Sequence, residues 1–181
     1  RKGAIERLKA HVDLGAVLGA DVIVGLIRGK MSDGLPYDEA IKHIKNGLSE
    51  VSAYARPKNV RILLEPINRY EIDLQNSIED AYSIASGLDD NVGLLIDTFH
   101  MNIEESSLTE PIRKAHDRIF HVHIADNIRW APGFGCLDFP AIVGALRDIG
   151  YKGYLSAEIL HEPDYEKAFR KTAEHMLPLI K

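Results

Sequence analysis

Four apolar, strand-like runs in this sequence each end on a residue whose side chain can bind a metal ion. The terminal residues of these runs are Glu65, Asp97, His123 and Glu158. In α/β folds the carboxyl ends of parallel strands form the edge of the sheet at which ligands bind. We therefore predict that these four side chains gather at one edge of a parallel sheet and hold a metal ion there.

Helical patterns separate the apolar runs, so the sequence predicts alternating strands and helices in a single domain over residues 1–181. The expected strands are residues 21–26, 60–65, 92–97, 119–123 and 153–158. The expected helices are residues 4–19, 38–56, 77–87, 108–115, 139–149 and 164–181. A loop is expected over 27–36, with Arg28 and Lys30 exposed on it, and Ser77 is expected to cap the helix that follows it.

A closed barrel explains the four strand ends better than a flat sheet does. Strands lie about 4.8 Å apart, so the first and fourth of four flat neighbours lie about 14 Å apart. A metal ligand must come within about 2–2.5 Å of the ion. Side chains at the mouth of a (β/α)₈ TIM barrel converge on the axis, and strand alternation would also turn His121 and Ser156 inward.

The five expected strands are fewer than the eight of a complete barrel. We therefore expect only the C-terminal part of a TIM barrel, about strands 4 to 8. Such an arc leaves two strand edges unpaired, which favours a homo-oligomer.

Composition narrows the partners and the compartment. The net charge of −5 predicts no nucleic-acid partner, since DNA-binding surfaces are usually basic. No apolar run approaches the roughly 20 residues that span a bilayer, so no membrane partner is expected. Cys136 is the only cysteine and the first residues show no signal peptide, which together predict a cytoplasmic location.

Four motifs at the strand ends give the chain a family resemblance. They are Glu-Pro-Ile-Asn-Arg-Tyr-Glu at 65–71, Asp-Thr-Phe-His-Met-Asn at 97–102, His-Val-His-Ile-Ala-Asp-Asn-Ile-Arg at 121–129 and Ala-Glu at 157–158. In this order the motifs resemble those of the sugar epimerases and isomerases with a xylose-isomerase-like barrel, especially the ketose 3-epimerases. The segment from Pro132 to Asp138 is similar to the Gly-rich loop beyond the seventh strand of that family.

The resemblance implies a role for each strand-end residue. Glu65, Asp97, His123 and Glu158 would bind one divalent metal ion, and Glu65 and Glu158 would also be the catalytic acid and base. Glu71, His100 and Arg129 would hold oxygens of a small sugar substrate. Three carboxylates and one imidazole suit Mn²⁺ first, with Mg²⁺, Co²⁺ and Zn²⁺ as alternatives.

The predicted reaction is proton transfer beside the carbonyl of a ketose or related hydroxy-carbonyl compound, through an enediolate. The sequence leaves epimerisation and aldose–ketose isomerisation both open. One alternative is an apurinic endonuclease-like phosphodiesterase, and another is a truncated barrel that binds a sugar without turnover. For Asp97 alone, a solvated strand terminus or a helix cap is the simpler interpretation.

Overall fold

Five parallel strands form one sheet in the computed structural model, which describes residues 1–31 and 34–181. The strands are β1 (Val22–Val24), β2 (Ile62–Leu64), β3 (Val92–Asp97), β4 (Ile119–Ile124) and β5 (Leu155–Ala157), and they pair in sequence order. Each lies in an expected strand or extends it by one residue. Two residues of the loop expected over 27–36, numbers 32 and 33, lie outside the described residues.

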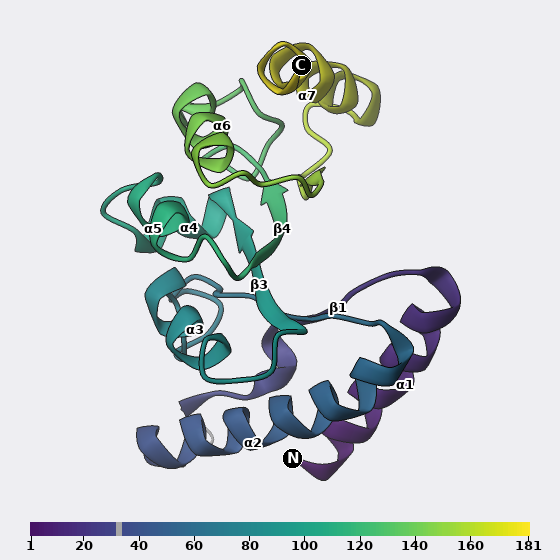
Figure 1. Cartoon of the computed structure of the whole chain (residues 1–181). Helices are drawn as coiled ribbons and strands as arrows, with labels where there is room; N and C mark the ends of the chain where they lie inside the picture. The colour runs from purple at the N-terminus through teal and green to yellow at the C-terminus, as the bar shows by residue number, and fades with distance from the viewer. Residues whose placement is uncertain (32–33) are drawn as a thin grey trace.

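Helices connect the strands and pack around the sheet, with the two termini at opposite ends of the molecule (Figure 1). The α-helices are α1 (Lys2–Leu18), α2 (Tyr37–Ala55), α3 (Ile78–Ala85), α4 (Thr98–Glu104), α5 (Glu110–Lys114), α6 (Phe139–Asp148) and α7 (Tyr165–Ile180). Two short 3₁₀-helices are η1 (Leu26–Arg28) and η3 (Arg56–Lys58). No helix in the described residues is long and apolar enough to span a membrane.

The two faces of the sheet differ in what they contact, and one of them packs against the helices. Ile62 and Leu64 of β2 belong to the apolar core that the strands share with the helices. Leu63 lies between them and points to the other face, because side chains alternate along a strand. His121 and Ser156 share that inner face, since His121 Nε2 and Ser156 Oγ lie 2.8 Å apart. The predicted inward direction of this pair is confirmed.

Helix α4 has no counterpart among the expected elements. Its apolar residues Phe99, Met101 and Ile103 alternate with a period of two, which is typical of a strand and hides the helix from a search for helical spacing. The helix begins directly after β3, and its first turn is capped by the last residue of that strand, Asp97. The strand end and the helix start are therefore one structural unit.

Candidate metal centre

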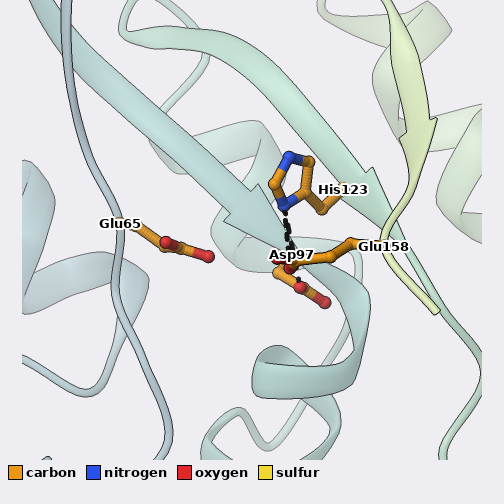
Figure 2. A group of neighbouring side chains, drawn as sticks. All are labelled: Glu65, Asp97, His123 and Glu158. Carbon is orange, nitrogen blue, oxygen red and sulfur yellow. Dashed lines mark hydrogen bonds and ion pairs between the residues drawn. The ribbon is translucent and has the colours of Figure 1, made fainter. Parts of the chain in front are cut away.

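The four strand-end side chains gather at one place in the fold. One donor atom from each of Glu65, Asp97, His123 and Glu158 lies within 4.8 Å of the others. Register explains part of this proximity, because Asp97 of β3 is the direct neighbour of His123 on β4. Figure 2 shows Asp97, His123 and Glu158 clustered together and Glu65 pointing toward them from across the gap. The predicted proximity is confirmed, while the role of these residues as ligands stays a prediction.

Asp97 is the most deeply buried member, with 0% of its surface exposed. Its Oδ1 accepts a hydrogen bond of 2.8 Å from the amide of Phe99 and so caps α4. Its Oδ2 lies 3.3 Å from Arg129 Nη1 and 4.0 Å from His123 Nδ1. Burial raises the pKa of Asp97, although the Arg129 charge acts against this. One oxygen thus serves the helix and the other faces the centre.

Glu158 and His123 form an ion pair on the other side of Asp97. Glu158 Oε2 lies 3.0 Å from His123 Nδ1 and 2.7 Å from Arg129 Nη2. The hydrogen bond from His123 lowers the pKa of Glu158 to about 2. Burial opposes the charged imidazole, but Glu158 and the other carboxylates outweigh it and raise the pKa of His123. The pairing therefore favours a negative charge on Glu158 and a positive charge on His123.

Glu65 is buried without a comparable partner in reach. Only 9% of its surface is exposed, and His100 Nε2 lies 3.9 Å from its Oε1. Burial, followed by the negative charge of Glu158, raises the pKa of Glu65 to about 7. This carboxyl group can therefore gain or lose a proton near neutral pH.

The donor set fits a divalent cation. Three carboxyl groups crowd together, and the pKa values of Glu65 and Asp97 are raised because burial makes their charges unfavourable. A divalent cation would offset these charges, and oxygen-rich sets with one imidazole suit Mn²⁺, Mg²⁺, Co²⁺ or Zn²⁺.

The predicted substrate-binding residues Glu71 and His100 lie beside the centre and are joined by Asn68. Asn68 Oδ1 accepts from the amide of Tyr70 at 3.0 Å, which fixes the orientation of its amide group. Its Nδ2 then donates to Glu71 Oε1 at 2.8 Å and to His100 Nδ1 at 2.8 Å. The bond from Asn68 makes Nδ1 the acceptor and leaves the hydrogen of the neutral ring on Nε2, which lies 3.9 Å from Glu65 Oε1 and 3.5 Å from Arg129 Nη1.

The His100 ring stays neutral at physiological pH. Burial and then the Arg129 charge lower the pKa of His100 to about 4. A neutral imidazole with its hydrogen on Nε2 can donate to a substrate oxygen without adding a charge.

Arg129 places its guanidinium over the centre from the loop after β4. Besides its contacts with Asp97 and Glu158, this group lies 4.7 Å from the ring centroid of Phe99. The backbone of Arg129 has a φ of 63°, a left-handed conformation that costs most side chains about 1–2 kcal/mol. All three predicted substrate-binding residues therefore lie at the same strand edge as the four candidate ligands.

The sequence did not indicate how two residues at this edge are used. Asn68 was visible only as one polar residue in a loop, although an amide is the one side chain that can donate twice and accept once there. The expected exposure of Arg28 is wrong, because its guanidinium is largely buried and its Nη2 donates to the carbonyls of Leu74 and Gln75. No local pattern in the sequence marks this burial, because Arg28 belongs to the short 3₁₀-helix η1, four residues beyond the end of β1.

An arc of parallel strands whose carboxyl ends gather three carboxylates and an imidazole defines this chain as part of a TIM-barrel protein with a candidate metal centre. A comparison with known protein families supports this fold over nearly the whole length of the chain. The chain belongs to the Xylose isomerase-like TIM barrel family, whose model matches residues 1–179. The predicted fold class, a TIM barrel represented by five strands, is confirmed.

The relatives of the chain include sugar epimerases. A D-psicose 3-epimerase of Enterocloster bolteae is 36% identical over 139 residues, which cover 72% of this chain and 46% of the relative. The crystal structure of a 3-keto-D-glucoside 4-epimerase from E. coli matches with a TM-score of 0.86 at 28% identity, covering 96% of this chain and 70% of that one. A crystal structure of the IOLI protein with a zinc atom matches with a TM-score of 0.81 at 26% identity, covering 97% and 68%. The chain spans about half the length of the curated relatives it matches.

Proposed function

We propose that this chain carries the metal-binding and proton-transferring edge of a sugar epimerase or isomerase that acts on a ketose or a related hydroxy-carbonyl compound. The observation that carries this proposal is the gathering of Glu65, Asp97, His123 and Glu158, with donor atoms within 4.8 Å of one another. Glu65 approaches the centre from one side and Glu158 from the other (Figure 2). A substrate carbon between them would have a carboxyl group on each face.

In this proposal Glu65, Asp97, His123 and Glu158 hold one divalent ion. Such an ion, when bound, makes the hydrogen beside a ketose carbonyl more acidic. One of Glu65 and Glu158 removes that hydrogen as a proton, and the other, protonated, returns a proton to the opposite face. Return to the same carbon gives epimerisation, and return to the neighbouring carbon gives isomerisation.

The other polar residues of the edge position the substrate. His100 presents its Nε2–H toward the space beside Glu65, and Asn68 keeps that tautomer in place. Arg129 offers a positive charge to a substrate oxygen, and Glu71 can accept from a hydroxyl group. The printed names of the relatives, D-psicose 3-epimerase and 3-keto-D-glucoside 4-epimerase, support a ketose or keto-sugar as the substrate class.

Three finer parts complete the proposal. Mn²⁺ is the first choice of metal from the oxygen-rich donor set, although the related IOLI structure holds zinc. A cytoplasmic location is proposed from the single, exposed Cys136. A homo-oligomer is proposed from the unpaired strand edges. The apurinic endonuclease-like alternative is not favoured, because the named relatives are sugar epimerases and isomerases.

The test is a panel of ketoses incubated with the chain and Mn²⁺ in D₂O and followed by NMR. We expect deuterium to enter the carbon next to the carbonyl of at least one sugar. Glu65→Gln and Glu158→Gln should each slow this exchange by about 10²–10⁴-fold with metal content measured alongside. Glu166→Gln, a change at a side chain that is 81% exposed on α7, should leave the rate unchanged. Full activity of both site variants with metal bound would refute the proposal, and sugar binding without any exchange would favour the non-catalytic alternative.

A further inference from the structure

The loop after β4, residues 125–138, is built around one buried carboxylate. Asp126 is only 1% exposed. Its Oδ1 accepts from the amides of Asn127 at 2.9 Å and Leu137 at 3.1 Å, and its Oδ2 accepts from the amides of Gly133 at 2.9 Å and Gly135 at 2.8 Å. A carboxylate has about four acceptor positions, and backbone amides of the same loop occupy them here.

The sequence of the loop matches this arrangement. A Cβ atom on Gly135 would clash with the side chains of Asp126 and Asn127, so only glycine lets the backbone approach the carboxylate this closely. The side chain of Asn127 adds a further tie, because its Oδ1 accepts from the amide of Cys136 at 3.0 Å. The second half of the loop, residues 133–137, is therefore held by the side chains of Asp126 and Asn127, which directly follow Ala125.

The near half of the loop contains Arg129. It is joined to Asp126 through the backbone groups of that residue and through the amide of Asn127, which donates to Asp126 Oδ1 inside the turn. The amide of Arg129 donates to the Asp126 carbonyl at 2.9 Å, and the Asp126 amide donates to the Trp130 carbonyl at 2.9 Å. The carbonyl of Arg129 accepts from the amide of Leu160 at 2.7 Å, just beyond Glu158. These bonds close a tight turn in which Arg129 keeps its left-handed φ of 63°.

We propose that Asp126 is a positioning residue that fixes the turn of Arg129 and thereby aims its guanidinium at the substrate space above Asp97 and Glu158. In the part of the chain that the structure describes, the Asp126 carboxylate bonds to amides of its own loop, and it acts through the loop backbone. This inference rests on the proposed function in one respect, since it assigns Arg129 to substrate binding. The structural part, the dependence of the Arg129 turn on the Asp126 carboxylate, stands apart from it.

The test is a double-mutant cycle with Asp126→Asn and Arg129→Met. Asparagine keeps the volume but turns an NH₂ group toward two backbone donors, so the loop loses two acceptors and the charge that binds it. We expect Asp126→Asn alone to lower kcat/KM for the ketose by about 10²-fold, the scale of a misplaced substrate contact. In the Arg129→Met background the same change should cost less than about threefold, because residues that act together are not additive. Equal effects in both backgrounds would overturn the inference.

The matched control is Asp138→Asn at the end of the same loop. Asp138 is exposed and caps α6 by accepting from the amide of Ala141 at 3.0 Å, without contacting Arg129. We expect the effect of Asp138→Asn on kcat/KM to be the same with and without Arg129→Met. Non-additivity as large as that of Asp126→Asn would show that any loosening of the loop disturbs Arg129, and would overturn a special role for Asp126.

A second readout needs no turnover. Amide hydrogen exchange over 127–137 and the NMR signal of Arg129 Nε–H should both show faster exchange in Asp126→Asn than in the wild type and in Asp138→Asn. Unchanged protection in Asp126→Asn would overturn the inference. Faster exchange in Asp126→Asn, combined with a wild-type chain that moves no substrate proton, would refute the proposed function and leave the positioning role supported.

Discussion

Asp97 caps a helix and also faces the candidate metal centre, so one carboxylate at a strand end can serve both purposes. One oxygen caps α4 and the other faces His123 and Arg129. The sequence could indicate Asp97 and the three other candidate ligands because each ends an apolar run, where charge is uncommon. It could not indicate Asn68, whose importance depends on His100, a partner 32 positions away.

Asp97→Asn tests the ligand role while keeping the helix cap, because asparagine caps helices about as well as aspartate. Loss of one charged oxygen donor should weaken Mn²⁺ binding by at least about tenfold. Isothermal titration calorimetry measures this, and Asp90→Asn, at a side chain that is 84% exposed, is the control. Equal affinity and stoichiometry in wild type and Asp97→Asn would contradict the assignment.

His100 predicts a specific acid sensitivity. Its pKa is lowered to about 4 in the folded chain, from an ordinary value near 6.5, so the unfolded chain binds more protons between these values. The free energy of unfolding should therefore fall as the pH drops from about 6.5 to 4. Urea unfolding at several pH values should show a shallower fall for His100→Gln, which cannot take up a proton. A variant with the same slope as the wild type would show that His100 is not held neutral.

At the scale of elements, the sequence predicted the features that depend on residues close together in the chain. Ser77 was enough to place the start of α3, and it forms a capping box with Asp80, in which Ser77 Oγ accepts from the Asp80 amide at 3.1 Å. Helix α4 was missed because its apolar residues alternate with a strand-like period, although the helix contacts both β3 and β4. Its buried side chains, Thr98, His100 and Met101, face the sheet and the site.

Ser77→Ala should destabilise the chain by about 1 kcal/mol, since the amide of Asp80 loses its acceptor. Ser83→Ala on the same helix is the matched control. Ser83 is exposed, and its hydroxyl donates to the carbonyl of Asp80 within α3, so alanine should change stability little there. Urea denaturation of both variants distinguishes a cap from a general effect of removing a hydroxyl group. An equal loss in both would contradict the capping role.

At the scale of the whole molecule, the need to focus four distant strand ends indicated a curved sheet. The strand order β1-β2-β3-β4-β5 follows the sequence, and the donor atoms still converge, which a flat sheet would not allow. The partner of the outer edges could not be predicted, because edge pairing depends on surfaces outside the five strands. Among the described residues, β1 and β5 each pair on one side only.

The open edge at β1 predicts self-association. Ile23, in the middle of β1, is 42% exposed beside unpaired backbone groups. We expect light scattering to show species larger than a monomer at micromolar concentration. Ile23→Lys should reduce their fraction, because a charged edge residue opposes strand pairing. A folded monomer in the wild type at these concentrations would contradict this prediction.

The spacing of the four strand-end residues along the chain has a consequence for how the fold holds together. They are separated by 32, 26 and 35 residues, and each belongs to a different strand-and-helix unit. An ion bound by all four would act as a cross-link that closes three successive chain segments. The entropy of closing each segment grows only slowly with its length, so one ion would restrain all three to a similar degree. Opening of any one unit would then require release of the ion, and local fluctuations that are separate in the metal-free chain would become a single cooperative event.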